Sequence, residues 1–90
     1  MKKRGRLEVI RDILRIIKEK NNSIRPTPLL RYSNLSSQRF SEYYKELIDK
    51  KFIKEIEDKK ARKSLTLTDK GFKFIEKYSL IVDFIDDFGL

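Results

Sequence analysis

The chain has 90 residues, enough for one domain with a thin hydrophobic core. Its 22 Lys and Arg residues outnumber 14 Asp and Glu residues, and the net charge of +8 favours a polyanionic partner. His, Cys and Trp are absent, which excludes disulfides and the usual nitrogen and sulfur ligands of a metal. The commonest general base and the best nucleophile are missing as well. We therefore expect no enzyme, no cofactor and no small-molecule ligand.

The positive charge is unevenly distributed along the chain. Residues 1–66 carry a net charge of +10, whereas residues 67–90 carry −2. Charged side chains between Arg6 and Asp12 interrupt any apolar segment of a signal peptide. The most apolar stretch, residues 78–90, is too short to span a bilayer and contains three Asp residues. We expect a cytoplasmic, nucleoid-associated protein with no membrane partner.

The first six residues are predicted to form a flexible basic arm, with Gly5 as a break. Two roles suit such an arm equally well. It would either contact DNA, along the phosphates or in a minor groove, or act only as a solubilising tail. The cations of the arm are Lys2, Lys3, Arg4 and Arg6.

Residues 7–20 are predicted to form an amphipathic helix. Apolar side chains recur at helical spacing from Leu7 to Ile17, and charged side chains lie on the opposite face. Asn residues tolerate the left-handed conformation that ends many helices. Asn21 and Asn22 are therefore expected to end this helix, and Ile24 to lie in a short first strand.

Two helices joined by a tight turn are predicted next. Thr27 is expected to be the N-cap of a short helix, with Pro28 at its first position. Ser33 and Asn34 end this helix and begin the turn. The second helix is expected over residues 36–50, with an apolar face made of Phe40, Tyr44, Leu47 and Ile48. Tyr43 lies at the edge of that face, and its role stays open.

A β-hairpin and a long helix complete the chain. Strands are predicted over residues 52–57 and 63–67, joined by a polar turn. Thr68 is a suitable N-cap for a helix that continues to about Asp87, with Gly89 beyond its end.

A short helix, a tight turn, a longer helix and a hairpin follow one another as in a winged helix-turn-helix. That arrangement places one helix in the major groove of DNA. We predict an α+β, mostly α fold: a winged helix-turn-helix of three helices and a hairpin wing over residues 7–67. A C-terminal dimerisation helix would occupy residues 68–90.

The helix over residues 36–50 carries polar side chains near its N-terminal half, the end that contacts base edges in this kind of docking. Gln suits adenine and Arg suits guanine. Glu42 would either accept from cytosine or pair with Arg39 or Lys45. A plain solvated face is as consistent with any one of these residues. The predicted DNA-binding residues of this helix are Ser36, Ser37, Gln38, Arg39, Ser41 and Lys45.

The predicted hairpin tip carries four cations in five residues. Such charges repel one another unless an anion is close, and binding DNA phosphates releases condensed counterions. A solvated turn is the alternative, since Lys is common on exposed edges. The predicted phosphate contacts are Lys59, Lys60, Arg62 and Lys63.

The last helix has more apolar residues than one small domain needs. Its main apolar arc covers about 140°, and Leu80 and Phe84 widen the arc by roughly another 80°. A second copy of the helix would cover the surplus, because a two-fold interface uses the same patch twice. Alternatively, the helix folds back onto its own core. The predicted dimer residues are Ile75, Tyr78, Ile81, Val82, Ile85 and Phe88.

Four segments carry a family resemblance: residues 7–14, 34–36, 44–48 and 65–71. They resemble the small archaeal winged-helix proteins that bind DNA as dimers through a C-terminal antiparallel coiled-coil helix. The resemblance covers nearly the whole chain. It implies a homodimer that contacts double-stranded DNA through residues 36–45 and the wing residues 58–63 of each copy.

The chain departs from the family pattern in two places. Lys51 stands directly after the second helix of the motif, where the family usually has Gly. The last helix stops early in an acidic end, which leaves the extent of the antiparallel coil open. The acidic residues are Asp83, Asp86 and Asp87.

The function expected from these features is a homodimeric DNA-binding protein, either a transcriptional regulator or a chromatin-like protein. A protein-interaction module without DNA binding is the main alternative, because the apolar surplus of the last helix would also suit a different protein. RNA binding would use the same positive charges.

Overall fold

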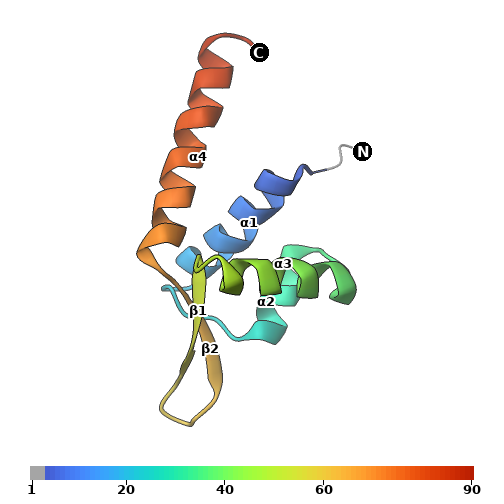
Figure 1. The fold of residues 1–90 in the computed structure, drawn as a ribbon, viewed down its shortest axis with the longest axis vertical. Coiled ribbons are helices and arrows are strands. Elements are labelled where there is room, and N and C mark those ends of the chain that lie inside the picture. The colour runs from blue at the N-terminus through green and yellow to red at the C-terminus, as the bar shows by residue number, and fades with distance from the viewer. Residues whose placement is uncertain (1–3) are drawn as a thin grey trace.

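The structure, a computed structural model, describes residues 4–90. The predictions made for Lys2 and Lys3 lie outside this range. The described residues form four helices and a two-stranded antiparallel sheet, in the order α1, α2, α3, β1, β2, α4. Helices α1 to α3 gather at the centre, the hairpin extends from one end, and α4 projects from the other (Figure 1). This is the mostly helical architecture that was predicted.

Helix α1 (Arg6–Glu19) lies at the centre of the core, where Ile13, Leu14 and Ile17 are fully buried. After the helix, Asn21 and Asn22 both have positive φ angles, of 59° and 56°, as predicted for its end. The side-chain carbonyl of Asn22 accepts from the Leu67 N–H at 2.7 Å. The end of α1 is thereby attached to the sheet.

Helix α2 (Pro26–Ser33) begins earlier than predicted. Arg25, not Thr27, is the N-cap, and Pro26, not Pro28, is the first residue. The ring of Pro26 holds φ near its helical value, and the residue before a proline prefers the extended backbone that an N-cap needs. Pro28 lies in the first turn, where a missing N–H costs nothing. The helix was predicted correctly, but its cap was wrong.

Helix α3 (Ser37–Asp49) follows a turn in which Asn34 is left-handed, with φ 58°. Ser36 caps it, because its hydroxyl accepts from the Arg39 N–H at 3.2 Å. Phe40 and Leu47 on the apolar face of α3 are buried. Lys51 then takes φ 64°, the left-handed conformation that favours the Gly usual in the family. For a residue with a side chain, that conformation costs on the order of 1 kcal/mol.

The hairpin forms the wing. Strand β1 (Ile53–Glu57) pairs with β2 (Lys63–Leu67), with Ile53 opposite Leu67 and Glu57 opposite Lys63. Ile24 adds a single bridge to Leu65, in place of the short strand that was predicted. Residues 64–67 of β2 are buried, whereas β1 is exposed beyond Ile53. The wing is therefore anchored at its base.

Helix α4 (Asp69–Asp87) begins at the predicted cap, where the Thr68 hydroxyl accepts from the Gly71 N–H at 3.2 Å. The same hydroxyl donates to the Lys51 carbonyl at 2.5 Å and lies 3.1 Å from the Phe52 carbonyl. A Cβ at Gly71 would overlap that carbonyl oxygen. Lys70 donates to the Lys50 carbonyl at 2.7 Å, at the end of α3. These contacts fasten the base of α4 to the segment between α3 and β1.

None of the helices within residues 4–90 is both long enough and apolar enough to cross a membrane.

Candidate nucleic-acid interface

All six predicted DNA-binding residues of α3 are exposed. At about 100° per residue, Gln38 and Lys45 point away from the buried Phe40 and Leu47. The remaining residues of the predicted set lie toward the N-terminal end of the helix. The outer face of α3 is thus polar and free to approach a partner.

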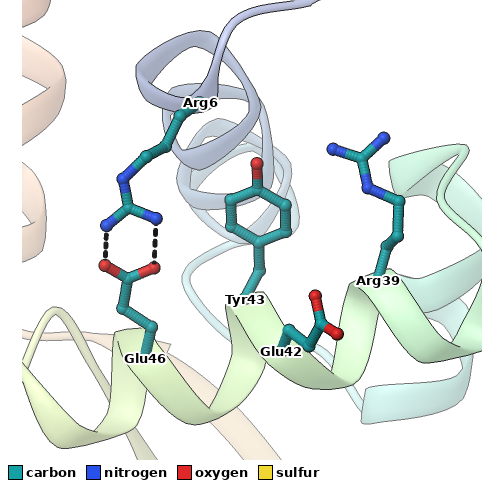
Figure 2. A pocket seen from close by; sticks show the side chains of 5 residues that line it. All are labelled: Arg6, Arg39, Glu42, Tyr43 and Glu46. Carbon is teal, nitrogen blue, oxygen red and sulfur yellow. Dashed lines mark hydrogen bonds and ion pairs between the residues drawn. The ribbon is translucent and has the colours of Figure 1, made fainter.

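Arg39 lies on the flank of α3 that faces α1. Together with Arg6, it lines a small pocket between the two helices (Figure 2). The guanidinium group of Arg39 lies 5.9 Å from the ring centre of Tyr43. This is a cation–π contact, and it involves a tyrosine that is half-buried. Within residues 4–90, Glu42 forms no ion pair with Arg39 or Lys45. Arg39 is therefore set apart from the outward-facing Gln38 and Lys45.

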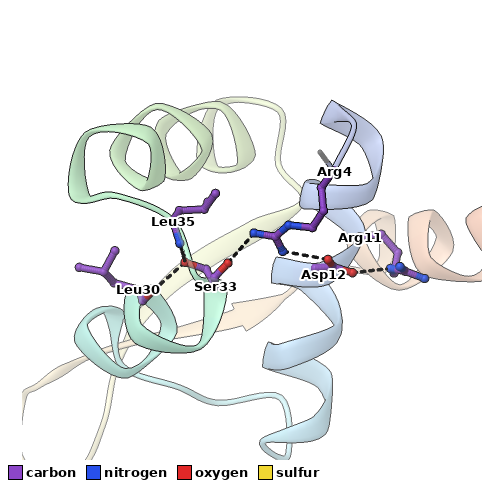
Figure 3. Close-up of polar contacts among 6 residues, drawn as sticks. All are labelled: Arg4, Arg11, Asp12, Leu30, Ser33 and Leu35. Carbon is purple, nitrogen blue, oxygen red and sulfur yellow. Dashed lines mark hydrogen bonds and ion pairs between the residues drawn. The ribbon is translucent and has the colours of Figure 1, made fainter. Parts of the chain in front are cut away.

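Arg6 and Arg4 are bound to the folded domain. Arg6 forms a two-pronged ion pair with Glu46 of α3 (Figure 2), and Glu46 also accepts from Lys50 at 2.8 Å. Arg4 donates to the Asp12 carboxylate at 2.9 Å and to the Ser33 carbonyl at 2.8 Å (Figure 3). These contacts bind the side chains of Arg4 and Arg6 to α1, α2 and α3 of the folded domain.

The Arg4 contacts belong to a chain of polar groups that joins the helix-turn-helix to α4. The Ser33 hydroxyl donates to the Leu30 carbonyl and accepts from the Leu35 N–H, which closes the turn after α2 (Figure 3). On the other side, Asp12 accepts from Arg11 at 2.8 Å. The Arg11 guanidinium lies 4.9 Å from the ring centre of Tyr78. This network orients the turn that precedes α3.

The wing tip is a closed turn built around Asp58. Its carboxylate accepts from the backbone N–H groups of Lys60 and Arg62, both at 2.9 Å, and from the Arg62 side chain at 3.1 Å. The hydrogen bond from the Arg62 backbone is the main reason why the pKa of Asp58 lies below its usual value. Ala61 completes the turn with φ 57°. The turn gives the tip a defined shape.

The four predicted wing cations differ in their surroundings. Arg62 pairs with Asp58, and Lys63 pairs with Glu55 at 3.0 Å. Lys59 and Lys60 are exposed, and neither takes part in an ion pair within the described chain. Two of the four positive charges at the tip are thus left without an ion-pair partner among the described residues.

A contact between α3 and the wing was missed from the sequence. Tyr44, which was assigned to the core, is only half-buried, and its hydroxyl donates to the Glu55 carboxylate. Burial, and then this hydrogen bond, raise the pKa of Tyr44. The Tyr44 hydrogen bond, followed by that from Lys63, lowers the pKa of Glu55. The signal in the sequence was the Tyr itself, because a partly buried Tyr hydroxyl usually has a hydrogen-bond partner.

The predicted dimer residues of α4 fall into two groups. Ile75 packs on the core, and Tyr78 lies stacked on Phe74 with ring centres 6.2 Å apart. Val82 is half-buried, while Ile81, Ile85 and Phe88 are exposed. Three further apolar side chains that were not predicted as dimer residues are exposed beside them. We call the resulting surface the exposed end of α4; it comprises Leu80, Ile81, Phe84, Ile85, Phe88 and Leu90.

Comparison with known proteins identifies the fold. A family model described as winged helix-turn-helix matches residues 3–85. The chain belongs to this family. No curated protein matches it. Among solved structures it is similar to F93 from STIV, a winged-helix DNA-binding protein, with a TM-score of 0.72 and 23% identity over 89% of this chain and 91% of that one. The predicted winged helix-turn-helix fold is therefore confirmed, whereas the archaeal source and the dimer stay predictions.

Proposed function

We propose that this protein binds double-stranded DNA as a homodimer and acts as a transcriptional regulator or a chromatin-like protein. The observation that carries the proposal is the wing tip. Asp58 holds a closed turn there, and the ammonium groups of the exposed Lys59 and Lys60 form no ion pair with the described residues. Phosphates are the anions that such a tip would meet beside a winged-helix motif. A cytoplasmic, nucleoid-associated location follows from this role.

In the proposed complex, α3 enters the major groove. Gln38 and Lys45 would face base edges, together with the capping Ser36 and its neighbours Ser37 and Ser41. Arg39 would reach the groove only by leaving the Tyr43 ring, so its contact is more easily made with a phosphate on the α1 side. The exposed hydroxyl and amide groups favour hydrogen bonding to DNA over apolar contact.

The wing would hold the phosphate backbone. Lys59 and Lys60 would make the main contacts. Arg62 uses only its Nε in the ion pair with Asp58, and its terminal N–H groups stay available to a phosphate. Lys63 remains more than half exposed beside Glu55 and has three donors to share. All four cations thus support the electrostatic part of binding.

The proposed dimer uses the exposed end of α4. Six large apolar side chains within residues 80–90, at the end of α4 and just beyond it, are costly to leave in water, and a two-fold contact would cover them. Charge favours an antiparallel pair. The first part of α4 carries Lys70, Lys73 and Lys77 together with Asp69 and Glu76, and its end carries Asp83, Asp86 and Asp87. A parallel pair would set the three Asp residues of the end beside their own copies. An antiparallel pair that crosses near Ile81, Val82 and Ile85 would instead bring Lys77 of one helix near Asp87 of the other.

The test is the affinity of the protein for a random-sequence duplex of about 30 base pairs across a salt series, with its mass measured in the same buffers. We expect dimers and a steep fall of affinity with salt. A selection for preferred sequences then separates a regulator from a chromatin-like protein with a flat sequence profile. Absence of binding at low salt contradicts the DNA role.

The exposed end of α4 also favours a second function, docking of a different protein through the same apolar side chains. In that case the pure protein is monomeric or aggregated rather than dimeric. Competition between duplex DNA and duplex RNA of equal length distinguishes the two nucleic acids.

A further inference from the structure

We propose that Tyr44, acting through Glu55, positions the wing relative to α3, so that helix and wing meet DNA as one rigid surface. The inference rests on the proposed function for its consequence in binding, but its structural part concerns the protein alone. It assigns to Tyr44 a positioning role, since its hydroxyl is directed at Glu55 rather than at a partner.

The two side chains meet because of their places on α3 and β1. Tyr44 packs against Phe40 with ring centres 5.9 Å apart, so its ring is held at the edge of the core. Glu55 follows the buried Ile53 by two residues, and alternate residues of a strand point to the same face. Glu55 therefore extends from the face that packs on the core, beyond the last buried residue of β1.

Lys63 extends the contact to the second strand. Its ammonium group lies 3.0 Å from the same Glu55 carboxylate that accepts from Tyr44. Lys63 stands opposite Glu57 in the sheet, so this pairing with Glu55 runs diagonally across the hairpin. One carboxylate thus joins α3, β1 and β2. We call the group Tyr44, Glu55 and Lys63 the wing brace.

The wing has few other attachments beyond its base. Strand β1 is exposed after Ile53, and the backbone bridge from Ile24 reaches β2 at Leu65. A five-residue strand is about 16 Å long, so a rotation of about 10° at the base moves the tip by about 3 Å. That shift is enough to separate Lys59 and Lys60 from phosphates while α3 stays in the groove. The brace restrains this rotation.

The structural test compares Tyr44→Phe with Tyr43→Phe in the protein without DNA. Both changes remove one hydroxyl from a half-buried Tyr of α3, but the Tyr43 hydroxyl makes no hydrogen bond within the described residues. NMR relaxation of the backbone amides at Lys59, Lys60 and Ala61 reports the order of the tip. We expect Tyr44→Phe to loosen the tip and Tyr43→Phe to leave it as in the wild type. Equal order in all three proteins overturns the inference.

Substitutions at Glu55 test the same contact from the other side and keep the ring of Tyr44 in place. Glu55→Gln retains an oxygen that accepts from Tyr44, so the tip should stay ordered, whereas Glu55→Ala should loosen it. This pair also decides the matter if Tyr44→Phe fails to fold. A tip that is equally ordered with Gln and with Ala contradicts the inference.

Binding gives the readout that a merely stabilising residue would not change. Removing one hydrogen bond should weaken DNA affinity about 2- to 10-fold in Tyr44→Phe. The fall in affinity caused by changing Lys59 and Lys60 together to Ala should be smaller in that background than in the wild type, because a loose wing contributes less. Additive effects overturn the positioning role. If the wild type does not bind DNA and the tip still loosens, the proposed function fails while the role of Tyr44 in holding the wing stands.

Discussion

Helices α1 and α4 both carry apolar side chains at helical spacing, but their surroundings are opposite. Helix α1 buries five apolar residues, whereas the longer α4 buries only Gly71. The difference lies in what surrounds each helix: α1 is enclosed by α2, the wing and the base of α4, while α4 extends beyond all of them (Figure 1). Periodicity therefore predicts that a helix has an apolar face, but the fold decides how much of that face its own chain covers.

The largest expected effect is loss of the proposed dimer when the exposed end of α4 is made less apolar. Ile81→Asp should give monomers by light scattering, because a buried carboxylate would appear on both sides of the proposed interface. We expect the substitution to weaken dimerisation by at least about 2 kcal/mol for each copy that carries it. Leu7→Asp is the matched control. Leu7 is 54% exposed, close to the 53% of Ile81. The mass of the Leu7→Asp protein should stay that of the dimer. Dimers of Ile81→Asp would place the interface elsewhere.

The attachment of α4 to the core is tested at Gly71. Gly71→Ala places a methyl group against the Phe52 carbonyl and should lower the free energy of unfolding by about 3 kcal/mol, as overpacking does. Urea denaturation measures the effect. Gly5→Ala is the control, because nothing lies within 4 Å of a Cβ at Gly5. An unchanged midpoint for Gly71→Ala would mean that the base of α4 moves aside easily.

The wing and the exposed end of α4 lie at opposite ends of the molecule (Figure 1). Substitutions in the wing should therefore change DNA affinity without changing dimerisation. Changing Lys59 and Lys60 together to Ala should weaken binding to all duplexes alike. The slope of log affinity against log salt should become shallower by about 0.9 for each phosphate that the wing no longer neutralises. The mass should not change. Lys77→Ala, on α4, should leave the salt slope unchanged. An unchanged salt slope for the double variant would remove the wing tip from the interface.

The smallest expected effect concerns the segment between α3 and the wing. Lys51→Gly should stabilise the fold by roughly 1 kcal/mol, because Gly adopts the left-handed conformation at φ 64° without a steric cost. The thermal midpoint should rise by a few degrees. Lys54→Gly, on the exposed part of β1, should instead lower it. A fall with Lys51→Gly would show that the Lys side chain contributes more than its backbone costs.

The sequence was sufficient to predict the elements themselves. Apolar spacing and capping residues are local signals, and they placed all four helices and both strands within about two residues. The cap at Thr68 was found in this way. The start of α2 was missed because Pro26 and Pro28 both suit a first turn, and local preference does not choose between them.

The candidate site was only partly readable. Exposure of Gln38 and Lys45 follows from helical spacing alone, and the cationic tip follows from four basic residues in a predicted turn. The sequence did not predict which of those cations form ion pairs, because Lys63 pairs with Glu55 on the neighbouring strand. Pairing of this kind depends on strand register, and several registers suit the same composition.

By itself, the sequence determined the helices, the strands, the basic charge and the apolar surplus of α4, because these depend on neighbours within one or two turns. Only the tertiary structure decided that Arg4 and Arg6 are bound rather than free and that Tyr44 reaches the wing. Arg6 meets Glu46 forty positions along the chain, and Tyr44 meets Glu55 from another element. Such contacts depend on how elements pack, and packing brings together residues whose separation in the sequence carries no signal of their proximity.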